Sequence, residues 1–213
     1  FKPLPKAALL NGGIEAKVVT VSASFAHNAA VTVNGHLFTW GDGKKGKLGH
    51  NDDATRLLPC IVRGFVDRGL HIIAAQAGGS HTLALSSYKQ AYSFGSGANG
   101  RLGHGNDSDQ WLPTLVSSLE RYQVVSLAAG HAHSVALTDD GQILTWGSGK
   151  LGCSGHGSDS DEVLPRKVLL FSHSTIRPVS VAAGEVHTSV LRSDGSMVTL
   201  GRVTHGRFAE GAC

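Results

Sequence analysis

One short pattern recurs four times in this 213-residue chain, and it constrains the fold more than any other feature. A histidine returns at intervals of 54, 52 and 54 residues: His27, His81, His133 and His187. A large apolar residue follows each histidine by 13 positions: Trp40, Phe94, Trp146 and Leu200. The stretch between them alternates apolar with small or polar residues on both sides of a turn, which is typical of a β-hairpin. One unit repeated at a fixed period therefore sets the architecture.

Each copy carries further elements in the same register. An apolar strand is predicted before each hairpin, at 18–21, 72–75, 124–128 and 179–182. A glycine stands three residues before the histidine in three copies (Gly78, Gly130 and Gly184), and Ser24 replaces it in the first. A glycine-rich loop follows each hairpin, at 41–50, 95–104 and 147–156, and decays in the fourth copy. A Leu-Pro pair at Pro5, Pro59, Pro113 and Pro165 predicts the start of an outer strand, because proline lacks a ladder donor.

These elements predict an all-β fold in which each unit is a four-stranded antiparallel sheet. Such units repeated end to end are the blades of a β-propeller, and a period of ~53 residues is long for one coil of a solenoid. We therefore expect a single propeller domain over residues 1–213, with repeats at about 5–58, 59–112, 113–164 and 165–213.

The repeat resembles that of the regulator of chromosome condensation family. The resemblance lies in Gly-x-x-His, an Asp-Gly turn, Trp-Gly, and Gly-x-Leu-Gly-His followed by Pro, as in residues 130–147 and 95–113. Copy two departs from it with Lys89-Gln90 at the turn, and copy four lacks Trp and Leu-Gly. Propellers of this family have seven blades, so the resemblance implies a partial propeller of about four of the seven.

An arc of four blades is expected to expose the apolar flanks of its first and last sheets. The chain starts at Phe1 without a methionine and stops within the fourth copy, so we interpret it as a piece of a longer protein. Exposed apolar flanks and unpaired edge strands mark interfaces or aggregation hazards. We expect residues 1–213 not to stand alone as a stable monomer.

The motifs that suggest chemistry have structural interpretations. G-x-G-x-x-G occurs three times from Gly41, Gly95 and Gly147, but no helix is predicted after it to hold a pyrophosphate. The repeat histidines lack a Cys or carboxylate at ligand spacing, so one hydrogen-bonded structural imidazole per blade is favoured over a metal site. The residues after them (Asn28, Thr82, Ser134 and Thr188) vary while staying small, which indicates packing between blades rather than a nucleophile.

We therefore predict no catalytic residues, no cofactor and no metal. The residues assigned a structural role by repetition are His27, His81, His133, His187, Gly78, Gly130, Gly184, Trp40 and Trp146. The candidate interaction residues are the cations of the glycine loops: Lys44, Lys45, Lys47, Arg101, Lys150 and Arg202. They could form a basic docking face on the end of the propeller that also carries the Gly-x-x-His turns. Acidic residues that follow in copies two and three favour a solvated rim of mixed charge.

Composition limits the partners. A net charge of +3 is too small to argue for direct nucleic-acid binding, and no apolar run is long enough to span a bilayer. Three cysteines without disulfide spacing suit an intracellular location in cytoplasm, nucleus or a cytoskeletal assembly. The sequence favours a non-enzymatic scaffold for protein partners. The family resemblance keeps two alternatives open: a guanine-nucleotide exchange factor for a Ran-like small GTPase, although no residue matches an exchange wedge, and the propeller domain of a ubiquitin ligase.

Overall fold

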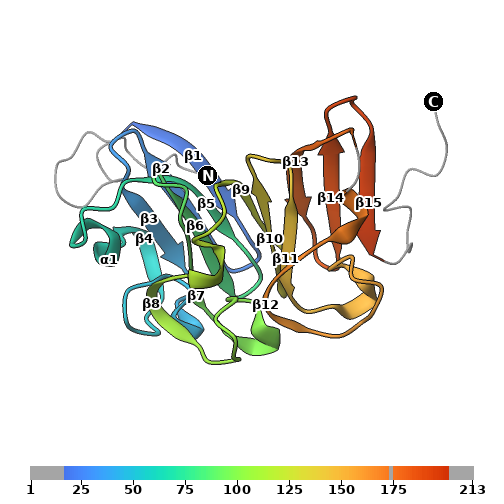
Figure 1. The fold of residues 1–213 in the computed structure, drawn as a ribbon. Helices are drawn as coiled ribbons and strands as arrows, with labels where there is room; N and C mark the ends of the chain where they lie inside the picture. The colour runs from blue at the N-terminus through green and yellow to red at the C-terminus, as the bar shows by residue number, and fades with distance from the viewer. Residues whose placement is uncertain (1–16, 173–174, 202–213) are drawn as a thin grey trace, which may run out of the picture.

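The repeats fold into four antiparallel sheets that stand side by side in an arc. The computed structural model describes residues 17–172 and 175–201. Figure 1 shows the sheets following one another around the arc in chain order. We call them blades 1 to 4. In every blade the strands lie in sequence order, so each strand pairs with the next one along the chain. This arrangement confirms the predicted all-β propeller fold.

The innermost strand of each blade is the predicted apolar one. Blade 1 contains β1 (Val18–Ala23), β2 (His27–Thr32), β3 (Leu37–Gly41) and β4 (Arg56–Ile61). Blade 2 contains β5 (Ile72–Ala77), β6 (His81–Ser86), β7 (Ala91–Gly95) and β8 (Gln110–Leu115). Blade 3 contains β9 (Val124–Ala129), β10 (His133–Thr138), β11 (Ile143–Gly147) and β12 (Glu162–Lys167). The described part of blade 4 contains β13 (Pro178–Ala183), β14 (His187–Arg192) and β15 (Met197–Gly201).

The Leu-Pro prolines lie inside the outer strands, so the prediction that they mark the strand start was wrong by three residues. Pro59 is the fourth residue of β4, and Pro113 and Pro165 hold the same place in β8 and β12. These strands are the last in their sheets, and an edge strand has one row of donors that needs no ladder partner. The equivalent Pro5 lies outside the described residues.

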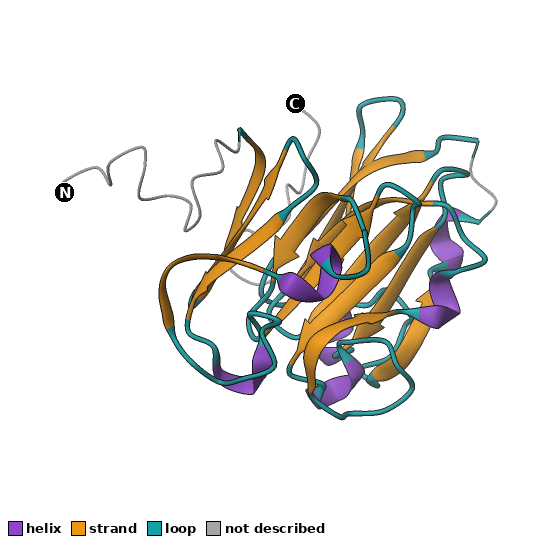
Figure 2. Ribbon diagram, turned by 90° about the vertical axis from the view of Figure 1, so that its left-hand side faces the viewer, coloured by secondary structure: helices purple, strands orange, loops and turns teal. Residues whose placement is uncertain are grey.

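Helical structure in the described residues is confined to single turns (Figure 2). The glycine loops contain the 3-10 turns η2 (Lys44–Gly46), η3 (Ala98–Gly100) and η5 (Lys150–Gly152). The connections between blades contain α1 (Arg63–Val66), η4 (Ser117–Leu119) and η6 (Leu169–Phe171). Each glycine loop runs on into an outer strand rather than a longer helix. No helix among the described residues is long and apolar enough to cross a membrane.

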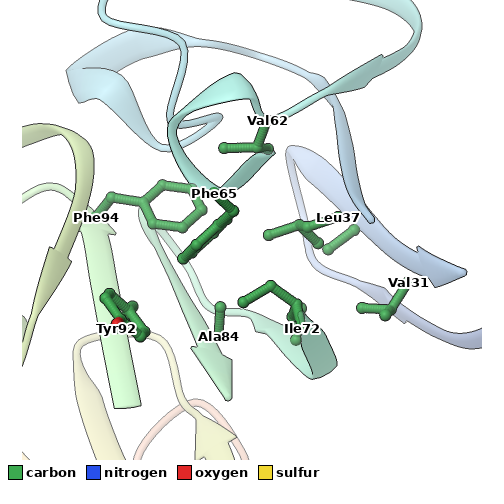
Figure 3. Packing of buried hydrophobic residues seen from close by; sticks show 10 residues of the cluster. Val31, Leu37, Val62, Phe65, Ile72, Ala84, Tyr92 and Phe94 are labelled. Atoms are coloured by element: carbon green, nitrogen blue, oxygen red, sulfur yellow. The ribbon is translucent and has the colours of Figure 1, made fainter. Parts of the chain in front are cut away.

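The core consists of one apolar cluster at each blade junction. Between blades 1 and 2, the ring of Phe65 packs edge-on against Tyr92 and Phe94, with centroids 5.3 and 6.4 Å away (Figure 3). Two similar clusters fill the junctions of blades 2 and 3 and of blades 3 and 4. Because strand side chains alternate, each inner blade contributes one face to each of its two neighbours. Blade-to-blade packing therefore supplies the buried apolar area of the fold.

Both outward flanks expose apolar side chains. In blade 4, Leu191 and Met197 are 43% and 58% exposed, whereas their counterparts in blade 3, Leu137 and Ile143, are buried against the next blade. The expected uncovered apolar surface is therefore present on the last flank. On the first flank, Val21 is 75% exposed, while Ala30 and Phe38, which are paired in the same row, are buried. The expected apolar exposure is therefore present on this flank at Val21.

A non-glycine residue occupies the tight hairpin turn of blade 2. Lys89 has a φ of 63°, and its counterparts in the other blades are Gly35, Gly141 and Gly195, with φ of 75°, 80° and 84°. Lys89 therefore adopts the left-handed backbone conformation that glycine has in the other turns. This conformation costs a lysine roughly 1–2 kcal/mol relative to glycine. Glycine also gains freedom in the unfolded chain, which offsets part of that difference.

Replacing Lys89 by glycine is expected to raise the free energy of unfolding by about 0.5 kcal/mol after this offset. Urea unfolding curves of the wild-type and Lys89→Gly chains measure it. Tyr88→Gly is the matched control, because Tyr88 is not among the described residues with positive φ. Glycine relieves no backbone strain there, so this variant should have a lower free energy of unfolding. A loss of stability in Lys89→Gly as large as in the control would contradict the explanation.

Candidate functional site

The repeat histidines link adjacent blades through hydrogen bonds. The Nε2 atom of His27 lies 2.8 Å from Thr82 Oγ1, that of His81 lies 2.9 Å from Ser134 Oγ, and that of His133 lies 3.0 Å from Thr188 Oγ1. Each histidine thus reaches the residue that follows the histidine of the next blade. Those small residues are acceptors in this link, and not only the small packing positions that the sequence indicated.

The direction of each link follows from the second bond of the hydroxyl. Thr82, Ser134 and Thr188 donate their single hydroxyl proton to a carbonyl in the preceding glycine loop, at 2.7, 2.8 and 2.9 Å. These carbonyls belong to Lys47, Arg101 and Cys153. The hydroxyl oxygen must therefore accept from the imidazole, which carries its proton on Nε2.

Burial keeps these imidazoles neutral. Desolvation lowers the pKa of His27 and of His133 from 6.5 to about 4, and lowers that of His81 well below 6.5. The lysine or arginine of the same loop and the neighbouring histidines act in the same direction. A neutral ring with Nε2–H committed to a hydroxyl is a structural link.

The repeated glycine before each histidine makes room for the ring. A Cβ atom on Gly78, Gly130 or Gly184 would lie 2.4, 2.2 or 2.1 Å from the imidazole of the same blade. With the ring placed as it is in these three blades, no side chain fits at those distances, which explains their glycine. In blade 1 the position is Ser24, and its Oγ lies 2.9 Å from Nδ1 of His27.

In blades 2 to 4, the large apolar residue of the hairpin packs against a glycine of the preceding loop. A Cβ on Gly103 would lie 2.9 Å from the ring of Trp146, which is fully buried. Gly49 meets Phe94 in the same way, and Gly155 meets Leu200. Trp40 holds this place in blade 1 and is only half-buried. The side chain at this position is therefore most deeply buried where the glycine loop of a preceding blade covers it.

The candidate basic residues divide into buried and exposed groups. Lys47 is 4% exposed, with its Nζ 2.6 Å from the Asp42 carboxylate. Arg101 is 7% exposed, and its guanidinium donates to the carbonyls of Ala98 and His131. Both side chains are held within the fold and are poorly placed to meet a partner.

The exposed cations lie among carboxylates. Lys44 and Lys150 are exposed, and Lys45 forms an ion pair with Asp109 at 3.1 Å. Asp109 also accepts from the backbone N–H of Gly97. The rim of the glycine loops is thus mixed in charge among the described residues. Arg202 lies outside them.

The Gly-x-x-His turns surround a shallow groove of about 550 Å³ at the inner edge of the blades. Its floor is formed by the alanines and glycines that end the innermost strands. The residue after the glycine position lines it in every blade: Phe25, Gly79, His131 and Glu185. Phe25 is fully exposed. The sequence did not predict this groove, although these four positions vary within an otherwise fixed motif.

No group of three or more His, Cys, Asp or Glu side chains that could hold a metal ion occurs in the described ranges. Cys60 and Cys153 are free thiols. Burial raises the pKa of the Cys153 thiol to about 11, which makes it a poor nucleophile at neutral pH.

Comparison with known proteins agrees with the architecture. Residues 34–85, 90–137 and 140–191 match the family model described as the regulator of chromosome condensation (RCC1) repeat, and residues 18–47 and 124–153 match a second RCC1 repeat model. The chain is 36% identical over 199 residues to the human E3 ubiquitin-protein ligase HERC2, covering 93% of this chain and 4% of that protein. It is 34% identical over 196 residues to the ultraviolet-B receptor UVR8 of Arabidopsis thaliana, covering 92% of this chain and 44% of that protein.

The fold is also that of a solved propeller, Prp20p from Saccharomyces cerevisiae, with a TM-score of 0.73 at 23% identity over 88% of this chain and 45% of that one. The chain thus spans less than half of each of these relatives. Three matched repeats, in register with the histidine links and the glycine loops, decide its classification. The chain belongs to the regulator of chromosome condensation (RCC1) repeat family.

Proposed function

We propose that this chain is a protein-binding module whose partner contacts the groove at the Gly-x-x-His turns. The observation that carries the proposal is Phe25, a fully exposed aromatic side chain at the rim of a groove with an apolar floor. Exposed aromatic residues beside apolar grooves are typical anchors of protein interfaces. The groove opens on the same end of the blades as the glycine loops, because the strands alternate in direction.

The groove is held rigidly while its lining varies. Backbone bonds join the turns of neighbouring blades, from Gly79 N–H to the Gly130 carbonyl at 3.1 Å and from His131 N–H to the Gly184 carbonyl at 3.3 Å. A preorganised frame lowers the entropy cost of binding. The variable residues at one position per blade can then select a partner without a change of the fold.

Among the alternatives, a recognition domain in a ubiquitin ligase is favoured by the 36% identity to HERC2. In such a protein the propeller would hold a partner, and the ligase chemistry would lie elsewhere. The likeness to Prp20p, which binds Gsp1p and histones, shows the fold alone at 23% identity. No described residue matches an exchange wedge, so we expect no acceleration of GDP release from a panel of small GTPases.

Site-specific photocrosslinking in the full-length protein tests the groove. A benzophenone amino acid at position 25 is expected to give discrete adducts with a partner in cells, and Glu185→Lys should reduce their yield several-fold. Position 88 is the matched control, because Tyr88 is an exposed aromatic residue in the hairpin turn at the other end of the blade. Adducts at position 88 but not at position 25 would place the partner elsewhere and refute the proposal.

A further inference from the structure

The four copies of the repeat provide an internal reference, because a residue needed for the fold should recur at the same place in each blade. The junction of blades 3 and 4 departs from that reference at the end of the blades opposite to the glycine loops. This end carries the hairpin turns and the connections between blades. The residues that differ here from the other copies are cations and exposed apolar side chains.

Three cations stand at this junction, and at two of these positions, Lys167 and Arg192, every described counterpart is neutral. Lys167 ends the outer strand of blade 3, and the equivalent residues are Ile61 and Leu115. The residue before the innermost strand is Arg177 in blade 4, and its counterparts in the earlier blades are Lys17, His71 and Gln123, so blade 1 also has a cation here. The last residue of β14 is Arg192, and its counterparts are Thr32, Ser86 and Thr138.

Two of these side chains, Lys167 and Arg177, line a small polar cavity. A volume of about 240 Å³ is lined by Lys167, Ser172, Arg177 and the hairpin turn at Gly141 and Gln142, among others. The carboxylate at its rim, Asp140, already accepts from the Thr138 hydroxyl and the Gln142 amide. The cavity therefore combines two cations with one carboxylate whose oxygens are engaged.

Two buried polar atoms beside the cavity lack a hydrogen-bond partner within the part of the chain that the structure describes: Ser172 Oγ and Arg192 Nε. Arg192 is paired in register with Pro178, which lines the cavity. Residues opposite each other in an antiparallel pair share a face, so Arg192 lies on the flank of blade 4 that faces blade 3. Donors that are buried and unpaired are costly, and an anion at this place would satisfy them.

Two leucines flank the same cavity on the outside. Leu169 and Leu170 are 73% and 62% exposed, while Phe171, the next residue of η6, points inward and is buried. The corresponding pairs in the other connections are Arg63-Gly64 and Ser117-Ser118. The fold therefore does not need apolar residues here.

We propose that the junction of blades 3 and 4 is a second protein-binding site, which takes a peptide segment of a partner that carries an anionic side chain next to an apolar residue. Lys167 and Arg177 hold the carboxylate or phosphoryl oxygens in the cavity. Leu169 and Leu170 contact the apolar neighbour. The site lies on the opposite end of the blades from the Phe25 groove and is independent of it.

An NMR titration of the full-length protein tests this site with three probes of the form acetyl-Gly-Leu-Xaa-Leu-Gly-amide. Xaa is phosphothreonine, glutamate or threonine. We expect saturable shifts of the Gly141, Val168 and Ser172 amides with one or both anionic peptides, and affinity at least five-fold weaker for the threonine peptide. Preference for phosphothreonine or for glutamate identifies which anion the site takes.

The variants are supplied by the other copies, so each introduced residue is one that this fold already accepts. Lys167→Leu and Arg177→Gln should each lower the affinity for the anionic peptides at least five-fold. The double variant L169S/L170S should lower the affinity for all three peptides. Lys150→Ala, on the glycine-loop end, is the matched charge control and should change nothing. Unchanged affinity in Lys167→Leu, shifts confined to the glycine loops, or no saturable shift with any probe would overturn the proposal.

Discussion

Acidification from pH 7 to about 4 is expected to remove most of the stability of this fold. His27, His81 and His133 are buried as neutral rings, and their folded-state pKa values lie below the 6.5 of an unfolded histidine. Between the two values the unfolded chain binds protons that the folded chain does not, so stability falls as the pH falls from 6.5 towards 4. With a folded pKa of about 4, His27 and His133 each contribute on the order of 3 kcal/mol to this loss.

That loss is comparable with the ~5–15 kcal/mol of a typical domain. It is complete only below pH 4, since the folded-state pKa sets its lower limit. Urea unfolding at pH 7.5, 6, 5 and 4.5, followed by tryptophan fluorescence, measures it. The matched variant is His27→Gln, which removes one buried ring and should reduce the fall in stability between pH 7.5 and 4.5. Equal stability at pH 7.5 and 4.5 would show that the buried rings are not neutral links.

Removal of Trp146 is expected to cost about 3–5 kcal/mol of unfolding free energy, as is usual for a fully buried large aromatic residue. Its ring fills the junction of blades 2 and 3 with Leu83, Val116 and Leu127 and lies against Gly103. An alanine would leave a cavity between the two sheets, and the sheets cannot move together to fill it. The loss should appear as a lower urea midpoint with an unchanged slope.

Trp40→Ala is the matched control, because Trp40 holds the same place in blade 1 but is only half-buried. We expect its cost to be less than half that of Trp146→Ala. Circular dichroism of both variants before unfolding checks that the sheets are retained. Equal costs would mean that the indole contributes within its own blade and not at the junction.

The repetition made much of this structure predictable. Glycine, histidine and tryptophan at fixed spacing indicate the strands, the turns and the residues with structural roles. A residue that recurs at the same place in each copy is one that the fold requires. The spacing could not indicate which blade each histidine contacts. Alternation tells which side of a strand a residue is on, but the hydroxyl partner of His81 lies 53 positions away.

Burial of the charged residues was the main feature that the sequence did not reveal. Lys47 and Arg101 stand in polar glycine loops and look like surface cations, yet both are enclosed beside the next blade. Their carbonyls, not their charges, enter the histidine links. The groove around Phe25 was also missed, because a single variable position in each copy stands out only when the turns are brought together in space.

The histidine links have a consequence for how such a protein can gain or lose length. Copies two and three each hold both halves of the contact: an imidazole and a loop carbonyl that face the next blade, and a hydroxyl that bonds to the imidazole and the loop carbonyl of the preceding blade. If one whole unit is duplicated in the gene, the new unit brings a donor for its successor and an acceptor for its predecessor. Deletion of a whole unit likewise leaves each remaining seam complete. Changes in repeat number by multiples of one unit therefore preserve these bonds, whereas a break within a unit separates the two halves.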